Sequence, residues 1–102
     1  MIPTKIQPLI KELKKIETVD KIYFFGSRAK GTHREDSDYD IALISENDDV
    51  LAIICKASVA LYAFYQGLDK FSLPSVEFHA LNEEELENTP IGQEITETGL
   101  VL

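Results

Sequence analysis

The segment at residues 38–44 constrains the fold most, because its polarity changes along its length. It begins with two aspartates separated by a tyrosine and ends in four apolar residues. This pattern is typical of an inner strand whose first end emerges at a polar site. Residues two apart in a strand point to the same face. Asp38 and Asp40 are therefore predicted to share one face, with Tyr39 and Ile41 pointing into the core.

The two aspartates suit a site for divalent cations. Carboxylates on one face repel each other unless a cation lies between them. Two residues span about 6.7 Å along a strand, so Asp38 and Asp40 can converge on one ion or bridge two ions roughly 3.5–4 Å apart. Oxygen-only ligation of this kind is typical of Mg²⁺. The alternative is a solvated strand start, in which Ser37 and Asp38 serve only a turn.

A second polar feature, Gly26-Ser27, directly follows a short apolar run at residues 22–25 that predicts a buried strand. Glycine lets the backbone and a ligand approach closely, and a short helix after it would direct N–H groups at an anion. Ser27 adds a hydroxyl, and Arg28 and Lys30 add cations. By itself such a turn is a weak signal for phosphate binding.

The remaining patterns predict helices around a small sheet. Apolar spacing predicts an amphipathic helix over residues 6–16, a helix over 50–66 closed by Gly67, and a strand over 73–81. Asn82 is predicted to cap an acidic turn at 83–87, and a last helix is predicted from Pro90 to Gly99 before an apolar tail at 100–102. This order favours an α+β fold, a small mixed β-sheet with helices packed on it.

Length and charge limit the function classes. A chain of 102 residues predicts one domain over residues 1–102, so an acceptor-gripping lobe would have to come from another chain. The net charge of −8 argues against direct nucleic-acid binding. Residues 1–34 hold eight basic and three acidic side chains, and residues 35–102 hold two and fifteen. These sections are either two solvated faces, or a basic section facing phosphate and an acidic section holding metal ions or a basic partner.

The longest apolar stretch, at residues 50–65, bears on location and partners. It is interrupted by Lys56 and Ser58 and is shorter than the ~20 residues that cross a bilayer. No signal-peptide pattern precedes it, so we expect a cytoplasmic protein without membrane association. The chain's only cysteine, Cys55, lies in this stretch and is predicted to be a buried, inert thiol. This helix is apolar nearly all round, so it is either buried centrally or leaves an uncovered face that serves as an interface.

The spacing between the two polar features resembles the signature of minimal nucleotidyltransferases of the DNA polymerase beta superfamily. That signature is Gly-Ser, a ten-residue interval and Asp-x-Asp, and this chain reads GS-RAKGTHREDS-DYD from Gly26 to Asp40. The AKG after the arginine resembles the family's small-basic-glycine element. The closing segments PIGQEI and GLVL are also similar to the ends of these short chains.

The resemblance implies a nucleotidyltransferase fold in which Gly26 and Ser27, with Arg28 and Lys30 nearby, bind the triphosphate of ATP. It further implies that Asp38 and Asp40 hold two Mg²⁺ ions.

A third carboxylate on a later strand completes the family's site, and the candidate here is Glu77. It alternates outward on the same side as His79. The commoner family residue is aspartate, one methylene shorter. His33 and His79 are predicted near the site, although histidines at such positions are more often structural or solvated.

The implied reaction is in-line attack of an acceptor hydroxyl on the α-phosphorus of a nucleoside triphosphate, with pyrophosphate leaving. Minimal nucleotidyltransferases of this size are typically encoded with a HEPN-type ribonuclease toxin. The resemblance therefore implies an antitoxin that transfers AMP from ATP to a tyrosine of that toxin. Two alternatives stay open: a non-catalytic module of the same fold that binds nucleotide or toxin, and a nucleotidyltransferase acting on a small molecule.

Overall fold

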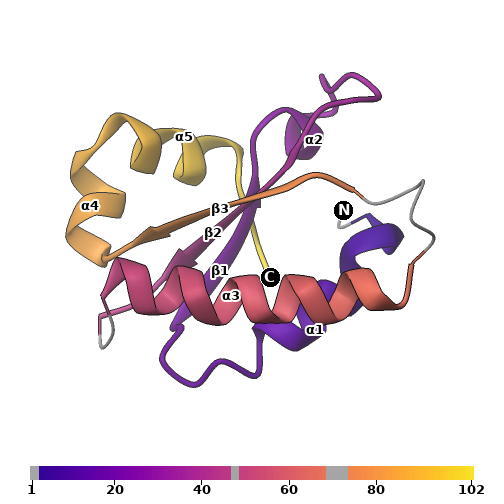
Figure 1. The fold of residues 1–102 in the computed structure, drawn as a ribbon. Coiled ribbons are helices and arrows are strands. Elements are labelled where there is room, and N and C mark those ends of the chain that lie inside the picture. Colours follow the sequence, from indigo (N-terminus) through magenta and orange to yellow (C-terminus); the bar gives the residue numbers. More distant parts are fainter. Residues whose placement is uncertain (1–2, 47–48, 69–73) are drawn as a thin grey trace.

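The computed structural model describes residues 3–46, 49–68 and 74–102. Within these residues four strands form one sheet in the order β3-β2-β1-β4 (Figure 1). Their bounds are β1 (Lys21–Phe25), β2 (Tyr39–Ile44), β3 (Val76–Leu81) and β4 (Leu100–Val101). Strand β2 is antiparallel to β1 and parallel to β3, and β4 is antiparallel to β1. This mixed sheet with its helices confirms the predicted α+β fold.

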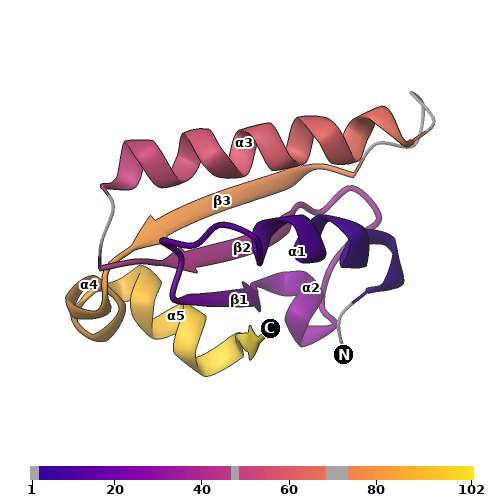
Figure 2. The ribbon, with the colours of Figure 1, turned by 90° about the horizontal axis from the view of Figure 1, so that it is seen from below.

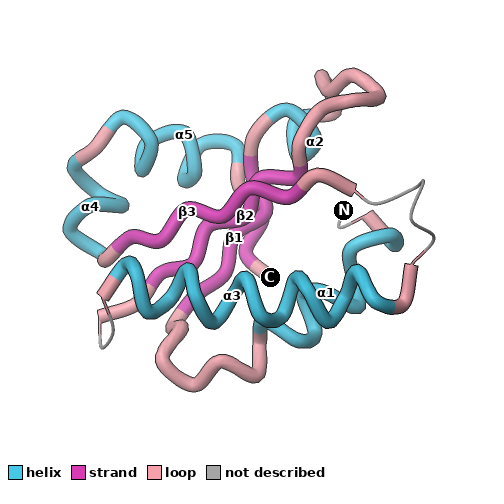
Figure 3. The backbone as a smooth tube through the Cα atoms, in the orientation of Figure 1, coloured by secondary structure: helices cyan, strands magenta, loops and turns pink. Residues whose placement is uncertain are grey.

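The helices lie close to the predicted ranges, except that the first ends earlier, and Figure 3 distinguishes the helices from strands and loops by colour. Their bounds are η1 (Thr4–Ile6), α1 (Gln7–Leu13), α2 (Ser27–Lys30), α3 (Val50–Gln66), α4 (Glu83–Asn88) and α5 (Pro90–Thr98). Side-chain caps account for three of the starts. The Asp49 side chain accepts from the Ala52 N–H at 2.7 Å, Asn82 forms a capping box, and Thr89 accepts from the N–H of Gly92.

Two helical layers cover the two faces of the sheet (Figures 1 and 2). Helices α1 and α3 pack on one face, around the fully buried Phe24 and Ile41. Helices α4 and α5 pack on the other face, around Phe25, Ala42 and Ile44. Tyr39 and Ile41 are buried in the α1–α3 core, as predicted. Asp40 alternates with them and therefore belongs to the face that α4 and α5 cover.

Three elements differ from the sequence-based prediction. The opening helix ends at Leu13 rather than Ile16, because the chain leaves it through tight turns that still bring Ile16 against the core. The apolar tail forms β4, which was not predicted because two residues are too few to show alternation. Strand β3 begins at Val76, and the start of its predicted range, at residue 73, lies outside the described residues.

A glycine allows α5 to pack directly on the end of α4. A Cβ atom at Gly92 would lie 2.2 Å from the carbonyl oxygen of Leu86 and 2.6 Å from that of Glu85. Real Cβ contacts are not this short, so a side chain at this position would force the two helices apart. Gly92 therefore fixes how α5 lies on the sheet.

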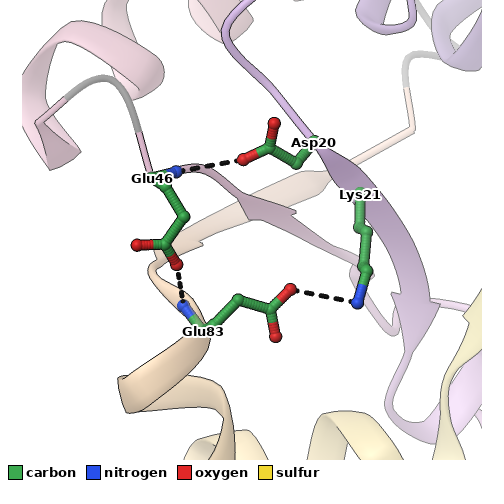
Figure 4. A network of polar contacts seen from close by, with 4 residues as sticks. All are labelled: Asp20, Lys21, Glu46 and Glu83. Atoms are coloured by element: carbon green, nitrogen blue, oxygen red, sulfur yellow. Dashed lines mark hydrogen bonds and ion pairs between the residues drawn. The ribbon is translucent and has the colours of Figure 1, made fainter.

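A polar network joins three elements at one end of the sheet (Figure 4). The N–H of Glu46 donates to Asp20 at 3.1 Å, and the N–H of Glu83 donates to the Glu46 carboxylate at 2.6 Å. Lys21 pairs with Glu83 at 3.0 Å, and the hydrogen bond to that carboxylate raises the pKa of Lys21. Because Lys21 is opposite Ile44, this network lies at the opposite end of β2 from Asp40.

The outer side of α3 is apolar and uncovered. Ile53, Ala57 and Phe64 face the core, whereas Leu51, Val59 and Tyr62 are 72%, 70% and 68% exposed. Of the two alternatives that the sequence left open for this helix, central burial or an uncovered face, the structure has the uncovered face. Cys55 is exposed on α3, so the expectation of a buried thiol was wrong. The reason is helical periodicity, since Cys55 lies two residues from both Ile53 and Ala57.

No helix of the described chain has the length and hydropathy of a membrane span.

Candidate active site

Sheet pairing aligns the ends of three strands. Phe25 is the partner of Asp40 across the β1–β2 pair, and Asp40 is the partner of Glu77 across the β2–β3 pair. Directly opposite residues in a sheet present their side chains on one face. The carboxylates of Asp40 and Glu77, 37 positions apart in the chain, therefore meet at one edge of this face.

His79 joins these two carboxylates in one cluster. One ligand atom from each of Asp40, Glu77 and His79 lies within 4.8 Å of the others. The Nε2 atom of His79 is 3.9 Å from Asp40 Oδ1 and 3.8 Å from Glu77 Oε1. The histidine ring packs edge-on against Phe25, with ring centroids 5.2 Å apart. The sequence placed His79 near the site, and the structure includes it in the group.

Gly26 lies directly against Asp40. A Cβ atom there would be 2.4 Å from Asp40 Oδ2, and the glycine has φ +81°. Only glycine tolerates both the backbone conformation and the contact. The Gly26 N–H donates to the Thr98 hydroxyl at 3.3 Å, and that hydroxyl donates to the carbonyl oxygen of Glu94 at 2.7 Å. The glycine turn is thus held between β2 and the last residue of α5.

Thr98 was not among the sequence-predicted site residues. A threonine in the last turn of a helix is ordinary, and nothing in its neighbourhood marks it as close to Gly26 in space. Only the packing of α5 beside the end of β1 creates this contact, which spans 72 residues.

The electrostatics of the cluster favour a bound cation. Burial raises the pKa of Asp40, and the charge of Glu77 raises it further. The nearby charges of Asp38 and Glu94 act in the same direction, whereas His79 lowers this pKa. The partly desolvated carboxylate of Asp40 is thus surrounded by other negatively charged side chains. The two carboxylates supply the hard oxygen donors that Mg²⁺ takes in proteins, so these residues fit the predicted ion.

Asp38 lies at the margin of this cluster. It is exposed and immediately precedes β2, which begins one residue later than the predicted strand. It is not one of the three residues whose ligand atoms meet within 4.8 Å. Its charge nevertheless acts on Asp40, as the direction of that pKa shift indicates. Asp38 therefore adds negative charge to the surroundings of Asp40.

Arg28 organises the loop that leads into β2. Its Nε atom donates to the Ser37 carbonyl oxygen at 2.8 Å, and Nη2 donates to that of Glu35 at 3.0 Å. Its guanidinium also lies 4.1 Å from the centroid of the Tyr39 ring. These contacts fix the chain just before Asp38.

The other sequence-predicted residues of this region lie in α2 and the loop after it. Ser27 is the first residue of α2 and is half-buried, next to Gly26. Lys30 is exposed at the other end of α2. His33 is exposed in the following loop and is not part of the cluster.

Comparisons with known proteins agree with this geometry. The fold and the site together define a nucleotidyltransferase-type domain. The family model described as "Polymerase beta, Nucleotidyltransferase" matches residues 6–102. The chain belongs to this family. The match includes α1, the glycine turn after β1, and the strands β2 and β3 that carry the cluster.

Solved structures share the fold. A mutant of the toxin–antitoxin MntA-HpeT is 23% identical, with 91% of this chain and 68% of that chain covered and a TM-score of 0.55. A toxin–antitoxin with AMP-PNP is 24% identical, with 95% and 68% covered and a TM-score of 0.54. No curated protein matches the chain significantly.

Proposed function

We propose that this protein is a Mg²⁺-dependent nucleotidyltransferase that acts as an antitoxin. In this proposal it transfers AMP from ATP to a tyrosine hydroxyl of a HEPN-type ribonuclease toxin. The observation that carries the proposal is the alignment of Asp40 and Glu77 beside Gly26. Family membership supports the reaction class. The partner is supported by the two structures of similar fold, which are toxin–antitoxins, one of them with AMP-PNP.

Each residue has a role in this reaction. Asp40, Glu77 and the adjacent Asp38 would hold the Mg²⁺ ions. When bound, these ions lower the pKa of the acceptor hydroxyl and stabilise negative charge on the leaving pyrophosphate. Gly26 leaves room for the Asp40 carboxylate, and the adjacent Ser27 would offer its hydroxyl to phosphate oxygens. Lys30 lies at the far end of the same short helix and adds positive charge.

The chemical step conserves atoms and charge. The acceptor oxygen bonds to the α-phosphorus as the bond from that phosphorus to the bridging oxygen breaks, and pyrophosphate leaves with the electron pair. The acceptor's proton passes to the Glu77 carboxylate, whose side chain is 57% exposed and so accessible to an incoming hydroxyl.

A protein acceptor suits the surface of the chain. The net charge of −8 favours a basic partner, such as a protein that cuts RNA. The apolar outer side of α3 offers a contact area, and it lies across the sheet from the cluster. A partner bound there would have to extend around the edge of the sheet to bring its tyrosine to the carboxylates. The ATP substrate and the single, exposed thiol are consistent with a cytoplasmic location.

The direct test is the intact mass of the toxin after incubation with this protein, ATP and Mg²⁺. The proposal expects the toxin to gain the mass of one AMP, and expects no gain with Asp40→Asn or with EDTA. Replacing the acceptor tyrosine by phenylalanine should also abolish the gain. A toxin that binds the wild-type protein but never gains mass would contradict the transferase proposal.

One observation favours a second candidate, a binding module without transfer. The third carboxylate is glutamate rather than the commoner aspartate, and its oxygen lies 3.8 Å from His79. A module would neutralise the toxin equally well with Glu77→Ala, whereas an enzyme would lose turnover. Measuring toxin neutralisation and mass gain for this one variant separates the two candidates.

A further inference from the structure

We propose that His79 is itself a metal ligand and shifts the preference of this site from Mg²⁺ towards Mn²⁺. The inference rests on the proposed metal-dependent function, and it concerns which cation the chain's own residues select.

The distances in the cluster suit a shared ion better than direct hydrogen bonds. The His79 Nε2 atom is 3.9 Å from Asp40 and 3.8 Å from Glu77, beyond the range of about 2.7–3.2 Å for hydrogen bonds. Ligand atoms at about 2.0–2.2 Å from one ion lie about 3–4.4 Å from one another. The two separations fall inside that interval. All three ligand atoms lie within 4.8 Å of one another, so small side-chain adjustments would let one ion contact all three residues without a change in the strands.

The orientation of the imidazole is set by packing. His79 is the β3 partner of Ala42 in β2, so its side chain emerges on the same face as Asp40. The imidazole and the Phe25 ring pack in an edge-to-face arrangement, with a centroid separation of 5.2 Å and an interplanar angle of 67°. The side chain is only 27% exposed. The Nε2 atom is thereby directed at the two carboxylates before any ion is bound.

The donor set decides the preferred cation. Mg²⁺ takes oxygen ligands and retains water, whereas an imidazole nitrogen suits transition metals. Two carboxylates and one imidazole form a mixed set that Mn²⁺ accepts readily. Carboxylates alone also bind Mn²⁺, so the distinctive claim is that a histidine nitrogen contacts the metal.

The chain allows a clean spectroscopic test because it contains only two histidines, His33 and His79. Full-length protein would be loaded with Mn²⁺ without nucleotide and examined by pulsed electron paramagnetic resonance, which detects imidazole nitrogen coupled to the metal. We expect this coupling in the wild type and in His33→Gln, the matched control in the exposed loop. We expect it to disappear in His79→Gln.

Affinity provides a second readout. Calorimetry should give a Mn²⁺ Kd at least ~10-fold weaker for His79→Gln, and a Mg²⁺ Kd that changes much less. Circular dichroism would verify that the variant is folded. The wild-type spectrum tests the proposal without any variant, so the test remains valid even if His79→Gln does not fold.

Three results would overturn the inference: no Mn²⁺ binding, no nitrogen coupling in the wild type, or coupling retained in His79→Gln. These outcomes are separable from the proposed function. AMP transfer with Mg²⁺ but without nitrogen coupling contradicts only the role of His79. Nitrogen coupling without AMP transfer contradicts only the transferase.

Discussion

At the residue scale, the site depends on Gly26, whose missing side chain leaves space for the carboxylate of Asp40. Asp40 occupies the space where any side chain at residue 26 would lie. Gly26 is therefore needed for the position of Asp40. Gly31 makes a useful comparison, because it also has a positive φ, of +80°, but has open space around it.

We predict that Gly26→Ala reduces AMP transfer on the order of 100-fold or more, because displacing Asp40 by about 1 Å misaligns the reacting groups. Gly31→Ala carries similar backbone strain without this contact and should retain most activity. Initial rates of AMP transfer, with unfolding free energies for both variants, check the prediction. Equal losses in the two variants would show that strain alone is responsible.

The raised pKa of Asp40 gives a pH-dependent stability. The folded protein keeps this proton at a higher pH than the unfolded chain, so unfolding releases it. Stability attributable to Asp40 therefore falls as pH rises from near 3.8 through the raised folded value. We predict that metal-free Asp40→Asn melts a few degrees higher than the wild type at pH 7, with the difference vanishing near pH 3.

Thermal unfolding across this pH range, with EDTA present, is the measurement. Asp36→Asn, which removes an exposed charge in the loop that precedes β2, should not reproduce the gain. A wild type more stable than Asp40→Asn at pH 7 would contradict the assigned direction. Added Mg²⁺ should narrow the difference, because only the wild type retains the full ligand set.

The site residues that lie on or beside strands could be predicted from the sequence. Alternation along each strand predicts which face Asp40 and Glu77 share, and Gly26 directly follows a predicted strand. The contacts of Arg28 and Thr98 were not readable, because they depend on how a loop folds back and where α5 packs. The roles of all these residues in binding or catalysis remain predictions.

At the element scale, helix packing determines where the site lies. Helix α5 covers the sheet beside the cluster and contributes Thr98 to the glycine turn. Its position depends on the close contact at Gly92.

We predict that Gly92→Ala lowers the free energy of unfolding by about 1–3 kcal/mol, because the added methyl group overlaps backbone oxygens of α4. Gly67→Ala is the matched control. A Cβ at Gly67 would meet only the carbonyl oxygen of Phe64 at 3.7 Å, an ordinary contact. Urea denaturation compares the two variants. A neutral or stabilising Gly92→Ala would mean that the helices separate without cost.

The outer side of α3 leads to a prediction about assembly. Val59→Glu and Tyr62→Glu place charge on exposed apolar positions, so each should change the stability of the isolated chain by no more than about 0.5 kcal/mol. Both should weaken binding to the toxin on the order of 10-fold or more. Gln93→Glu, exposed on α5, is the control. Unchanged affinity in surface plasmon resonance would remove α3 from the interface.

Elements with a local sequence signal were predictable, whereas the two-residue strand β4 was not. The apolar faces of α1 and α3 and the cap at Asn82 are local signals, and they located these helices, although α1 ends three residues earlier than predicted. Strand β4 depends on pairing with β1, which is invisible in a two-residue segment. The exposure of Cys55 was not predicted, because burial was inferred from the apolar residues around it and not from the side of the helix on which Cys55 lies.

At the scale of the whole molecule, the two sides of the sheet carry different features. One side holds the α1–α3 core and the exposed apolar surface of α3, and the other side holds the α4–α5 core and the acidic cluster. A mixed sheet allows this arrangement because the parallel β2–β3 pair brings Asp40 beside Glu77, while the antiparallel β1 delivers Gly26 at the same edge. The single-domain organisation of residues 1–102 remains a prediction.

The central claim is that Asp40 and Glu77 bind a divalent cation together with a nucleotide. Calorimetric titration of the full chain with AMP-PNP, in Mg²⁺ and in EDTA, tests it most directly. We predict saturable binding in Mg²⁺ that is lost in EDTA and in Asp40→Asn. Nucleotide binding that is equally strong without Mg²⁺, or unaffected by Asp40→Asn, would contradict the claim.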